Sequence, residues 1–167
     1  MTPGQLPDAE RLLDALVAQM RPHVAVETGL IGIVTGGAWL AERLHSALGL
    51  AVPFGTLDAA FYRDDFQRKG LKRKVAPSNI PFEVAGRDLI LVDDVLYTGR
   101  TIRAAMNELF DYGRPASIRL ASLIDRGGRE LPISAQFVGA AVTLEAAQSV
   151  ELRRDAQGRL SLALSEV

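Results

Sequence analysis

The sequence contains no cysteine and only two histidines, His23 and His45. These shortages exclude disulfide scaffolds and thiolate metal sites, and they leave little material for a metal site built from imidazoles. The sequence also has no excess of one charge: it contains 19 Lys and Arg and 20 Asp and Glu, which gives a net charge of -1. This balance excludes a generally basic nucleic-acid-binding protein, although a local basic patch remains compatible with it.

Long apolar runs and targeting signals are absent as well. Every apolar stretch is interrupted before the roughly 20 residues that a membrane-spanning helix needs. The first ten residues carry Pro3, Pro7, Asp8 and Glu10, with no basic flank and no apolar core, unlike a secretory signal. We therefore expect a cytoplasmic protein with no membrane contact.

What is present is an ordinary globular composition, with 48% hydrophobic and 23% charged residues in 167 positions. This length predicts one domain spanning residues 1–167, with a core large enough to be stable without cross-links. Strands are predicted at 29–35, 52–61, 89–92, 118–124, 137–138, 149–152 and 160–164, the last two joined by a hairpin turn at 155–158. Helices are predicted after Pro7-Asp8 up to Met20, at 38–48 and at 101–112, with Phe110 among the inward-facing residues. The alternation predicts an α/β fold with a mostly parallel sheet, which binds ligands at the carboxyl ends of its strands.

The most informative motif runs from Leu89 to Thr101. An apolar strand is predicted to end at Asp93 and Asp94, and Thr98-Gly99-Arg100-Thr101 then opens a helix. The start of a helix offers amides and a positive dipole end to a phosphate. Paired carboxylates suit a diol, a divalent cation or a developing positive charge instead. Together the two features predict a site for a ribose 5-phosphate, the alternative being a capped helix without a ligand.

This segment resembles the phosphoribosyl pyrophosphate signature of the type I phosphoribosyltransferases. Three further segments narrow the resemblance: Tyr62-Arg-Asp-Asp65, Tyr112-Gly-Arg-Pro115 and Asp125-Arg-Gly-Gly-Arg-Glu-Leu-Pro-Ile133. They are similar to the branch of pyrimidine operon attenuation regulators that are also uracil phosphoribosyltransferases. The resemblance covers about residues 29–139. It implies a type I phosphoribosyltransferase fold, a mostly parallel sheet flanked by helices with a small hood formed by the chain ends.

The implied reaction joins uracil to phosphoribosyl pyrophosphate and releases pyrophosphate, with Mg2+ bound alongside the phosphoribosyl pyrophosphate. The resemblance assigns catalysis to Asp93, Asp94 and Arg63, and pyrophosphate binding to the glycine-rich turn Thr35, Gly36 and Gly37. It assigns nucleotide binding to Leu89, Ile90, Leu91, Val92, Asp93, Asp94, Val95, Leu96, Tyr97, Thr98, Gly99, Arg100 and Thr101. The turn can also be a structural turn only, and relatives usually carry arginine where Gly36 stands.

A basic segment at residues 67–80 matches the family's catalytic lid in position and character. Its candidates for neutralising the leaving pyrophosphate are Arg68, Lys72, Arg73 and Lys74. The alternative is a solvated run of charge. Arg63 precedes the lid and either contacts pyrophosphate or pairs with Asp64 or Asp65.

The segment after residue 124 is the implied base site. Uracil would be recognised by main-chain groups of Asp125, Arg126 and Gly127, whereas the alternative is a loop in which Arg126, Arg129 and Glu130 form surface ion pairs. The partners implied are uracil, phosphoribosyl pyrophosphate, UMP or UTP, and a second copy of the chain in a homodimer or larger assembly. A transferase for a different base is a further alternative.

Regulators of this branch also bind pyrimidine leader mRNA through basic residues, and Arg126 and Arg129 stand at matching positions. Relatives usually have His and Arg where this sequence has Gly128 and Ser134, which weakens the expectation of RNA binding. The rival hypothesis is nonetheless a regulator that senses uridine nucleotides and binds RNA with little or no turnover.

Overall fold

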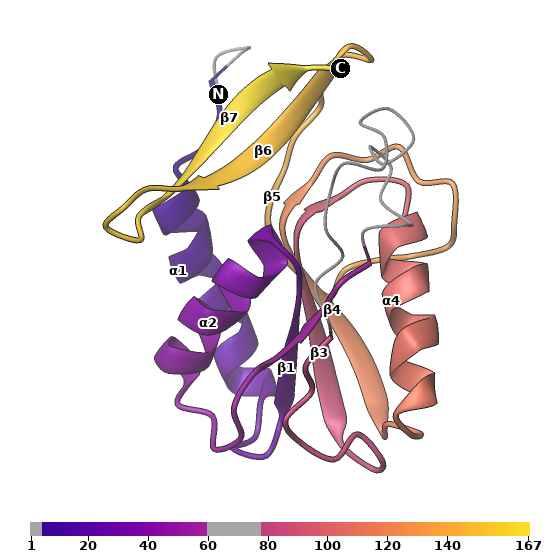
Figure 1. Ribbon diagram of the computed structural model, residues 1–167. Coiled ribbons are helices and arrows are strands. Elements are labelled where there is room, and N and C mark those ends of the chain that lie inside the picture. The colour runs from indigo at the N-terminus through magenta and orange to yellow at the C-terminus, as the bar shows by residue number, and fades with distance from the viewer. Residues whose placement is uncertain (1–4, 60–77) are drawn as a thin grey trace.

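A five-stranded parallel sheet forms the centre of the molecule, seen in a computed structural model that describes residues 5–59 and 78–167 (Figure 1). Its strand order is β2-β1-β3-β4-β5. The strands are β1 (Gly29–Ile33), β2 (Gly55–Leu57), β3 (Asp88–Leu96), β4 (Ser117–Asp125) and β5 (Phe137–Ala141). β1 and β3 are buried along nearly their whole length, as expected for strands with helices on both faces.

Helices cover the two faces of the sheet. Helices α1 (Ala9–Met20) and α2 (Gly36–Leu48) lie on one face, and α4 (Arg100–Asp111) lies on the other (Figure 1). A short 3-10 helix, η1 (Arg21–His23), follows α1. The helices pack against the sheet and bury two hydrophobic cores, one on each face. Burying each large aliphatic side chain of these cores stabilises the fold by about 1.5–3 kcal/mol.

Local signals in the sequence explain where the first two helices begin and end. Asp8 caps α1, because its side-chain oxygen accepts a hydrogen bond from the Arg11 amide at 3.0 Å. Gly49 ends α2 in the left-handed conformation at φ 64°, which glycine adopts without steric cost. Both boundaries agree with the sequence prediction.

An antiparallel hairpin stands above the carboxyl ends of the strands (Figure 1). It consists of β6 (Gln148–Arg154) and β7 (Leu160–Glu166), joined by a turn in which the Asp155 carboxylate accepts amide hydrogen bonds from Gln157 and Arg159. The predicted hairpin is therefore confirmed, and it is the hood. The other chain end contributes through the first turn of α1, where Glu10 accepts a hydrogen bond from the Leu160 amide at 2.8 Å.

Three details differ from the sequence prediction. The strand predicted at 52–61 is reduced, within its described residues, to Gly55–Leu57, because Val52 lies in a bend and Pro53, which has no amide hydrogen, lies outside the ladder. The side chain of Phe110, predicted to face inward, is 56% exposed, since the buried stripe of α4 is Ile102, Ala105 and Leu109. β3 also continues beyond the two acids to Leu96.

No helix among residues 5–59 and 78–167 is long and apolar enough to cross a membrane.

Candidate active site

A cleft of about 520 Å3 lies between the carboxyl ends of the central strands and the hood. It brings together the glycine-rich turn before α2, the acid pair of β3, the start of α4 and the inner side of the hairpin. Its lining is Thr35, Gly36, Trp39, Asp93, Asp94, Val95, Tyr97, Thr101, Arg126, Ser149, Val150, Glu151, Leu152, Ser165, Glu166 and Val167. This is the end of a parallel sheet at which ligands bind.

The acid pair sits inside β3 and not at its end, which corrects the sequence prediction. The pairing of β3 with β4 continues past the acids to the Leu96 and Asp125 pair, so ladder hydrogen bonds hold the segment extended. Asp93 is only 3% exposed, and its carboxylate accepts a hydrogen bond from the Asp94 amide at 2.9 Å. The Asp94 carboxylate accepts from the Val95 amide at 3.0 Å and borders the cleft. Both residues line the same cleft.

The loop from Tyr97 to Gly99 leads from β3 into α4. Gly99 occupies the position before the helix with φ 92°, a conformation that favours glycine, and a Cβ there would stand 2.9 Å from Ile133 Cγ1. The Thr98 hydroxyl accepts a hydrogen bond from the Arg100 amide at 3.2 Å. Thr101, in the first turn, lines the cleft. The predicted helix start is confirmed, and the first turn gives the cleft a positive dipole end.

The glycine-rich turn lies directly against the acids. A Cβ at Gly36 would stand 2.7 Å from the Asp94 Cγ atom, so only glycine leaves the Asp94 side chain in its place. The turn opens α2, with Thr35 as its capping residue, and the peptide bond between Val34 and Thr35 is cis. Thr35 and Gly36 both line the cleft. The structure thus brings the predicted pyrophosphate turn and the predicted ribose-binding acids together.

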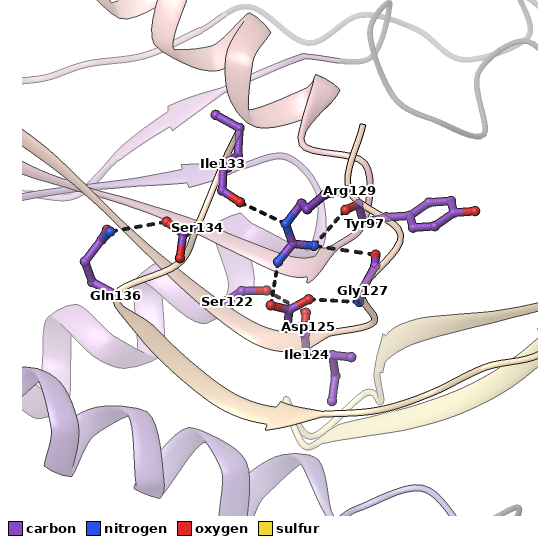
Figure 2. A network of polar contacts seen from close by, with 9 residues as sticks. All are labelled: Tyr97, Ser122, Ile124, Asp125, Gly127, Arg129, Ile133, Ser134 and Gln136. Carbon is purple, nitrogen blue, oxygen red and sulfur yellow. Dashed lines mark hydrogen bonds and ion pairs between the residues drawn. The ribbon is translucent and has the colours of Figure 1, made fainter. Parts of the chain in front are cut away.

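The segment between β4 and β5 is organised around Arg129 (Figure 2). Its guanidinium donates to the carbonyl oxygens of Tyr97 at 2.7 Å and Ile133 at 2.9 Å, and it pairs with Asp125 at 2.5 Å. Burial alone would raise the pKa of the Asp125 carboxyl, but hydrogen bonds from Arg129 and the Gly127 amide outweigh it and lower that pKa below 3.8. Arg129 therefore points into the molecule and holds several carbonyls at once.

Arg126 takes a different position. Its guanidinium carbon lies 3.9 Å from the centre of the Tyr97 ring, and Nη2 donates to the Gln148 carbonyl oxygen at 3.0 Å. The Nε atom is buried and has no hydrogen-bond partner among the residues that the structure describes. Two amides predicted to recognise uracil are already engaged, since Arg126 donates to the Leu96 carbonyl and Gly127 donates to the Asp125 carboxylate.

The ion pairs considered for this segment form in part. Glu130 pairs with Arg100 at 2.6 Å, and Arg129 pairs with Asp125. Arg126 instead stacks on the Tyr97 ring at the edge of the cleft. The segment therefore combines the two alternatives that the sequence left open, because its ion pairs hold a loop that also lines the cleft.

Sequence reasoning missed the contribution of the hood. Ser149, Glu151 and Ser165 line the cleft, and so does Trp39 of α2. The ring of Trp39 has the Arg154 guanidinium 4.8 Å from its centre. The alternation of polar and apolar residues in the hairpin could have suggested two different faces. It could not show that one of them covers the acid pair.

Several predicted residues lie outside the described part of the chain. They are Arg63, Arg68, Lys72, Arg73 and Lys74. The end of the predicted lid is described: Asn79 forms a two-bond bridge with Thr56 beside β2, and the Ser78 hydroxyl donates to Glu108 of α4 at 2.5 Å. Asn79 therefore lies at the edge of the sheet, beside β2.

A second groove, of about 780 Å3, lies between α2 and the turn of the hood, on another side of Trp39. Its charged residues include Arg43, which pairs with Glu10 at 2.7 Å, and Arg154, which pairs with Glu42 at 3.5 Å. Although this groove is larger, it lies away from the acid pair and from the first turn of α4. We therefore assign the site to the cleft.

Comparison with known proteins agrees with this geometry. The sequence profile of the phosphoribosyl transferase domain matches residues 5–151. The chain belongs to this family. A protein of Ralstonia nicotianae named bifunctional protein PyrR is 50% identical over 162 residues, which cover 95% of this chain and 92% of the relative. A protein of the same name from Pseudomonas paraeruginosa is 53% identical over 152 residues, covering 88% of this chain and 89% of the relative. The branch that the sequence motifs predicted is thereby confirmed.

Solved structures extend the comparison to the fold of this phosphoribosyltransferase. A hypoxanthine-guanine phosphoribosyltransferase from Bacillus anthracis superposes with a TM-score of 0.65 at 20% identity, over 82% of each chain. A hypoxanthine phosphoribosyltransferase from Trypanosoma cruzi gives a TM-score of 0.63 at 21% identity, over 83% of this chain and 80% of the other. At this identity the likeness concerns the fold alone, and it confirms the predicted type I phosphoribosyltransferase architecture.

Proposed function

We propose that this phosphoribosyltransferase transfers the phosphoribosyl group to uracil, giving UMP and pyrophosphate. The observation that carries the proposal is the shared cleft: the glycine-rich turn adjoins Asp94, and the first turn of α4 lines the same space. A ribose 5-phosphate carries a diol, which suits the acid pair, and a phosphate, which suits the start of a helix. The choice of uracil over other bases rests on the branch of relatives to which the chain belongs.

In this proposal each wall of the cleft holds one part of the substrate. Asp93 and Asp94 bind the ribose hydroxyls, and the negative charge of the half-buried Asp94 carboxylate stabilises the oxocarbenium-like centre as the bond from C1 to pyrophosphate breaks. The loop from Leu96 to Thr101 holds the 5-phosphate. The turn at Thr35–Gly37 receives the leaving pyrophosphate, with Arg63 and the lid cations supplying positive charge. Uracil N1 forms the new bond to C1 and loses its proton, so catalysis consists mainly of positioning and charge stabilisation.

The base would lie beside the segment from Asp125 to Gly127. Because the amides of Arg126 and Gly127 are engaged, we assign recognition of uracil to main-chain carbonyls of this segment and to the Arg126 side chain. Arg126 lines the cleft, and its guanidinium is the donor that we assign to a uracil oxygen.

Magnesium fits this site as a companion of the substrate. Carboxylate oxygens are ligands that Mg2+ prefers, and Asp93 and Asp94 provide them in the cleft. Within residues 5–59 and 78–167 no group of three or more His, Cys, Asp or Glu side chains gathers, so substrate oxygens would supply most of the coordination. The ion would neutralise charge on the pyrophosphate. We further propose a homodimer or larger assembly and a cytoplasmic location, where uracil and phosphoribosyl pyrophosphate are both available.

A radiolabelled-uracil assay tests the proposal, with hypoxanthine and guanine in parallel reactions. We expect turnover with uracil alone, and a loss of at least about 100-fold in kcat/KM on Asp94→Asn, as for other groups that stabilise developing charge. Asp88→Asn is the matched control, because Asp88 opens the same strand and is exposed, and its carboxylate accepts a hydrogen bond from the Ser117 hydroxyl at 2.6 Å. Turnover with a purine, or full activity of Asp94→Asn, would contradict the assignment.

Binding of pyrimidine leader mRNA is a second candidate function. The observation in its favour is the pair formed by Arg126 and Tyr97, a residue that is 36% exposed at the edge of the cleft. An exposed aromatic ring beside a guanidinium is suited to stacking with an unpaired base. A gel shift on leader RNA from the pyrimidine genes of its source, with and without UMP, tests this function. Absence of a shift at physiological salt would exclude it.

A further inference from the structure

Hydrogen bonds join the segment between β4 and β5 to the loop from Leu96 to Thr101, which we call the phosphate loop. We call residues 126–133 the strap. The amide of Arg126 donates to the Leu96 carbonyl at 3.0 Å, and the amides of Glu130 and Leu131 donate to the Thr98 carbonyl at 3.0 and 3.2 Å. The side chain of Ile133 also fills the space where a Cβ on Gly99 would lie. The conformation of the phosphate loop therefore depends on a segment more than 25 residues away in sequence.

Arg129 is the residue through which the strap holds both itself and the loop (Figure 2). All three nitrogens of its guanidinium donate: Nε to the Ile133 carbonyl, Nη1 to the Tyr97 carbonyl and Nη2 to the Asp125 carboxylate. The side chain is 26% exposed. A planar fork of fixed donors can serve three acceptors in different directions, which a lysine ammonium cannot reproduce in the same geometry.

Holding a carbonyl also fixes the amide of the next residue, because a peptide group is planar and, when trans, points its C=O and N–H in opposite directions. Arg129 fixes the Tyr97 carbonyl, and the strap amides fix the Thr98 carbonyl. The amides of Thr98 and Gly99 are consequently turned away from the strap. These are two consecutive amides of the loop that leads into α4.

We propose that Arg129 is a positioning residue for the 5-phosphate of the substrate. It orients the loop amides before the substrate arrives, and it does so through the Tyr97 carbonyl without touching the substrate. This inference rests on the proposed function of the loop from Leu96 to Thr101. It also gives Arg129 a role different from the RNA contact that the family resemblance implies.

The test compares Arg129→Met and Arg129→Lys with the wild-type protein. Methionine keeps the length and apolar part of the side chain but donates nothing, whereas lysine can restore the pair with Asp125 alone. We expect Arg129→Met to raise the KM for phosphoribosyl pyrophosphate at least tenfold, with kcat at saturation within threefold and the KM for uracil unchanged. Arg129→Lys should raise the same KM at least threefold. Arg11→Met removes an exposed cation from α1, away from the cleft, and should leave all three constants unchanged.

Binding of ribose 5-phosphate, measured by calorimetry on the same variants, keeps this test separate from that of the proposed function. If the wild-type protein does not transfer the phosphoribosyl group to uracil, the proposed function fails. The ratio of the affinities of wild type and variant for ribose 5-phosphate then decides the role of Arg129. If Arg129→Met does not fold, Arg129→Lys carries the comparison. Wild-type constants and wild-type affinity in the folded variants would overturn the inference. So would a selective loss of RNA binding, which would assign Arg129 to the RNA surface.

Discussion

Gly37 lies against the main chain of β3 at Val92. A Cβ on Gly37 would stand 3.2 Å from the Asp93 Cα atom and nearer still to the Val92 carbonyl oxygen. The first turn of α2 and the strand that carries the acids are thus in backbone contact. Any displacement of one of them changes the distance between the proposed pyrophosphate turn and the proposed ribose-binding acids.

Replacing Gly37 by alanine tests this contact. Because the added methyl group meets backbone and not a flexible side chain, α2 must move, and we expect the free energy of unfolding to fall by about 1–3 kcal/mol. The KM for phosphoribosyl pyrophosphate should rise several-fold. Denaturant unfolding and steady-state kinetics measure the two effects.

Gly86→Ala serves as the control for that substitution. Gly86 has φ 72° and nothing within 4 Å of its Cβ position, so alanine there strains the backbone at the start of the turn before β3 without touching the cleft. It should cost on the order of 1–2 kcal/mol of stability and leave the KM unchanged. Equal kinetic effects of the two substitutions would show that the contact between Gly37 and Val92 has no part in substrate binding.

The sequence predicted most of the elements that carry the site, for reasons that are local. Asp8 and Gly49 mark helix ends through side-chain capping and a left-handed backbone, both of which follow from residue type. Thr98 and Gly99 likewise mark the start of α4. The cleft at the carboxyl ends of the strands then follows from the parallel topology.

The parts that the sequence did not predict depend on contacts between distant segments. Asp93 and Asp94 were expected at a strand end because they are polar, but pairing with β4 extends the strand through them. Arg129 looked like a surface cation, and only the fold brings the Tyr97 carbonyl within its reach. The face of the hood that covers the acids is likewise set by how the hairpin packs.

A double-mutant cycle tests the packing of Tyr97 on Gly128. Gly128 has φ 74°, and a Cβ there would stand 2.9 Å from Tyr97 Cδ2 and closer to the neighbouring ring carbon, so alanine must displace the ring from its stack with Arg126. We expect Gly128→Ala to lower the free energy of unfolding by about 1–3 kcal/mol. When Tyr97 is already replaced by alanine, the loss of unfolding free energy caused by Gly128→Ala should be smaller by at least about 0.5 kcal/mol. The loss that remains reflects backbone strain at residue 128. If the effects of Gly128→Ala and Tyr97→Ala on unfolding free energy simply add, the contact between these two residues is contradicted.

The pH dependence of stability tests the pair between Asp125 and Arg129. The hydrogen bonds of Arg129 and Gly127 lower the pKa of Asp125 below 3.8 in the folded protein. A carboxyl group whose pKa is lower in the folded protein than in the unfolded chain stabilises the folded state at any pH above its unfolded pKa. That contribution is lost as the pH falls through the folded pKa. Asp125→Asn should therefore be less stable than wild type by about 1–3 kcal/mol between pH 5 and 7, with the difference shrinking below pH 3.8.

Glu10 provides a reference for the same experiment. A hydrogen bond from Arg43 lowers the pKa of Glu10 from 4.5, although burial opposes the shift, so wild-type stability also has an acid-sensitive contribution far from the strap. Glu10→Gln should remove that contribution and leave the effect of Asp125→Asn unaltered. A difference between wild type and Asp125→Asn that stays constant down to pH 3 would exclude the pair as a stabilising interaction.

A crystal structure of the protein with UMP tests the account most directly. The account predicts the ribose hydroxyls at the carboxylates of Asp93 and Asp94, with the 5-phosphate on the loop from Tyr97 to Thr101. A nucleotide bound in the groove between α2 and the hood turn, with the cleft free of it, would contradict the account.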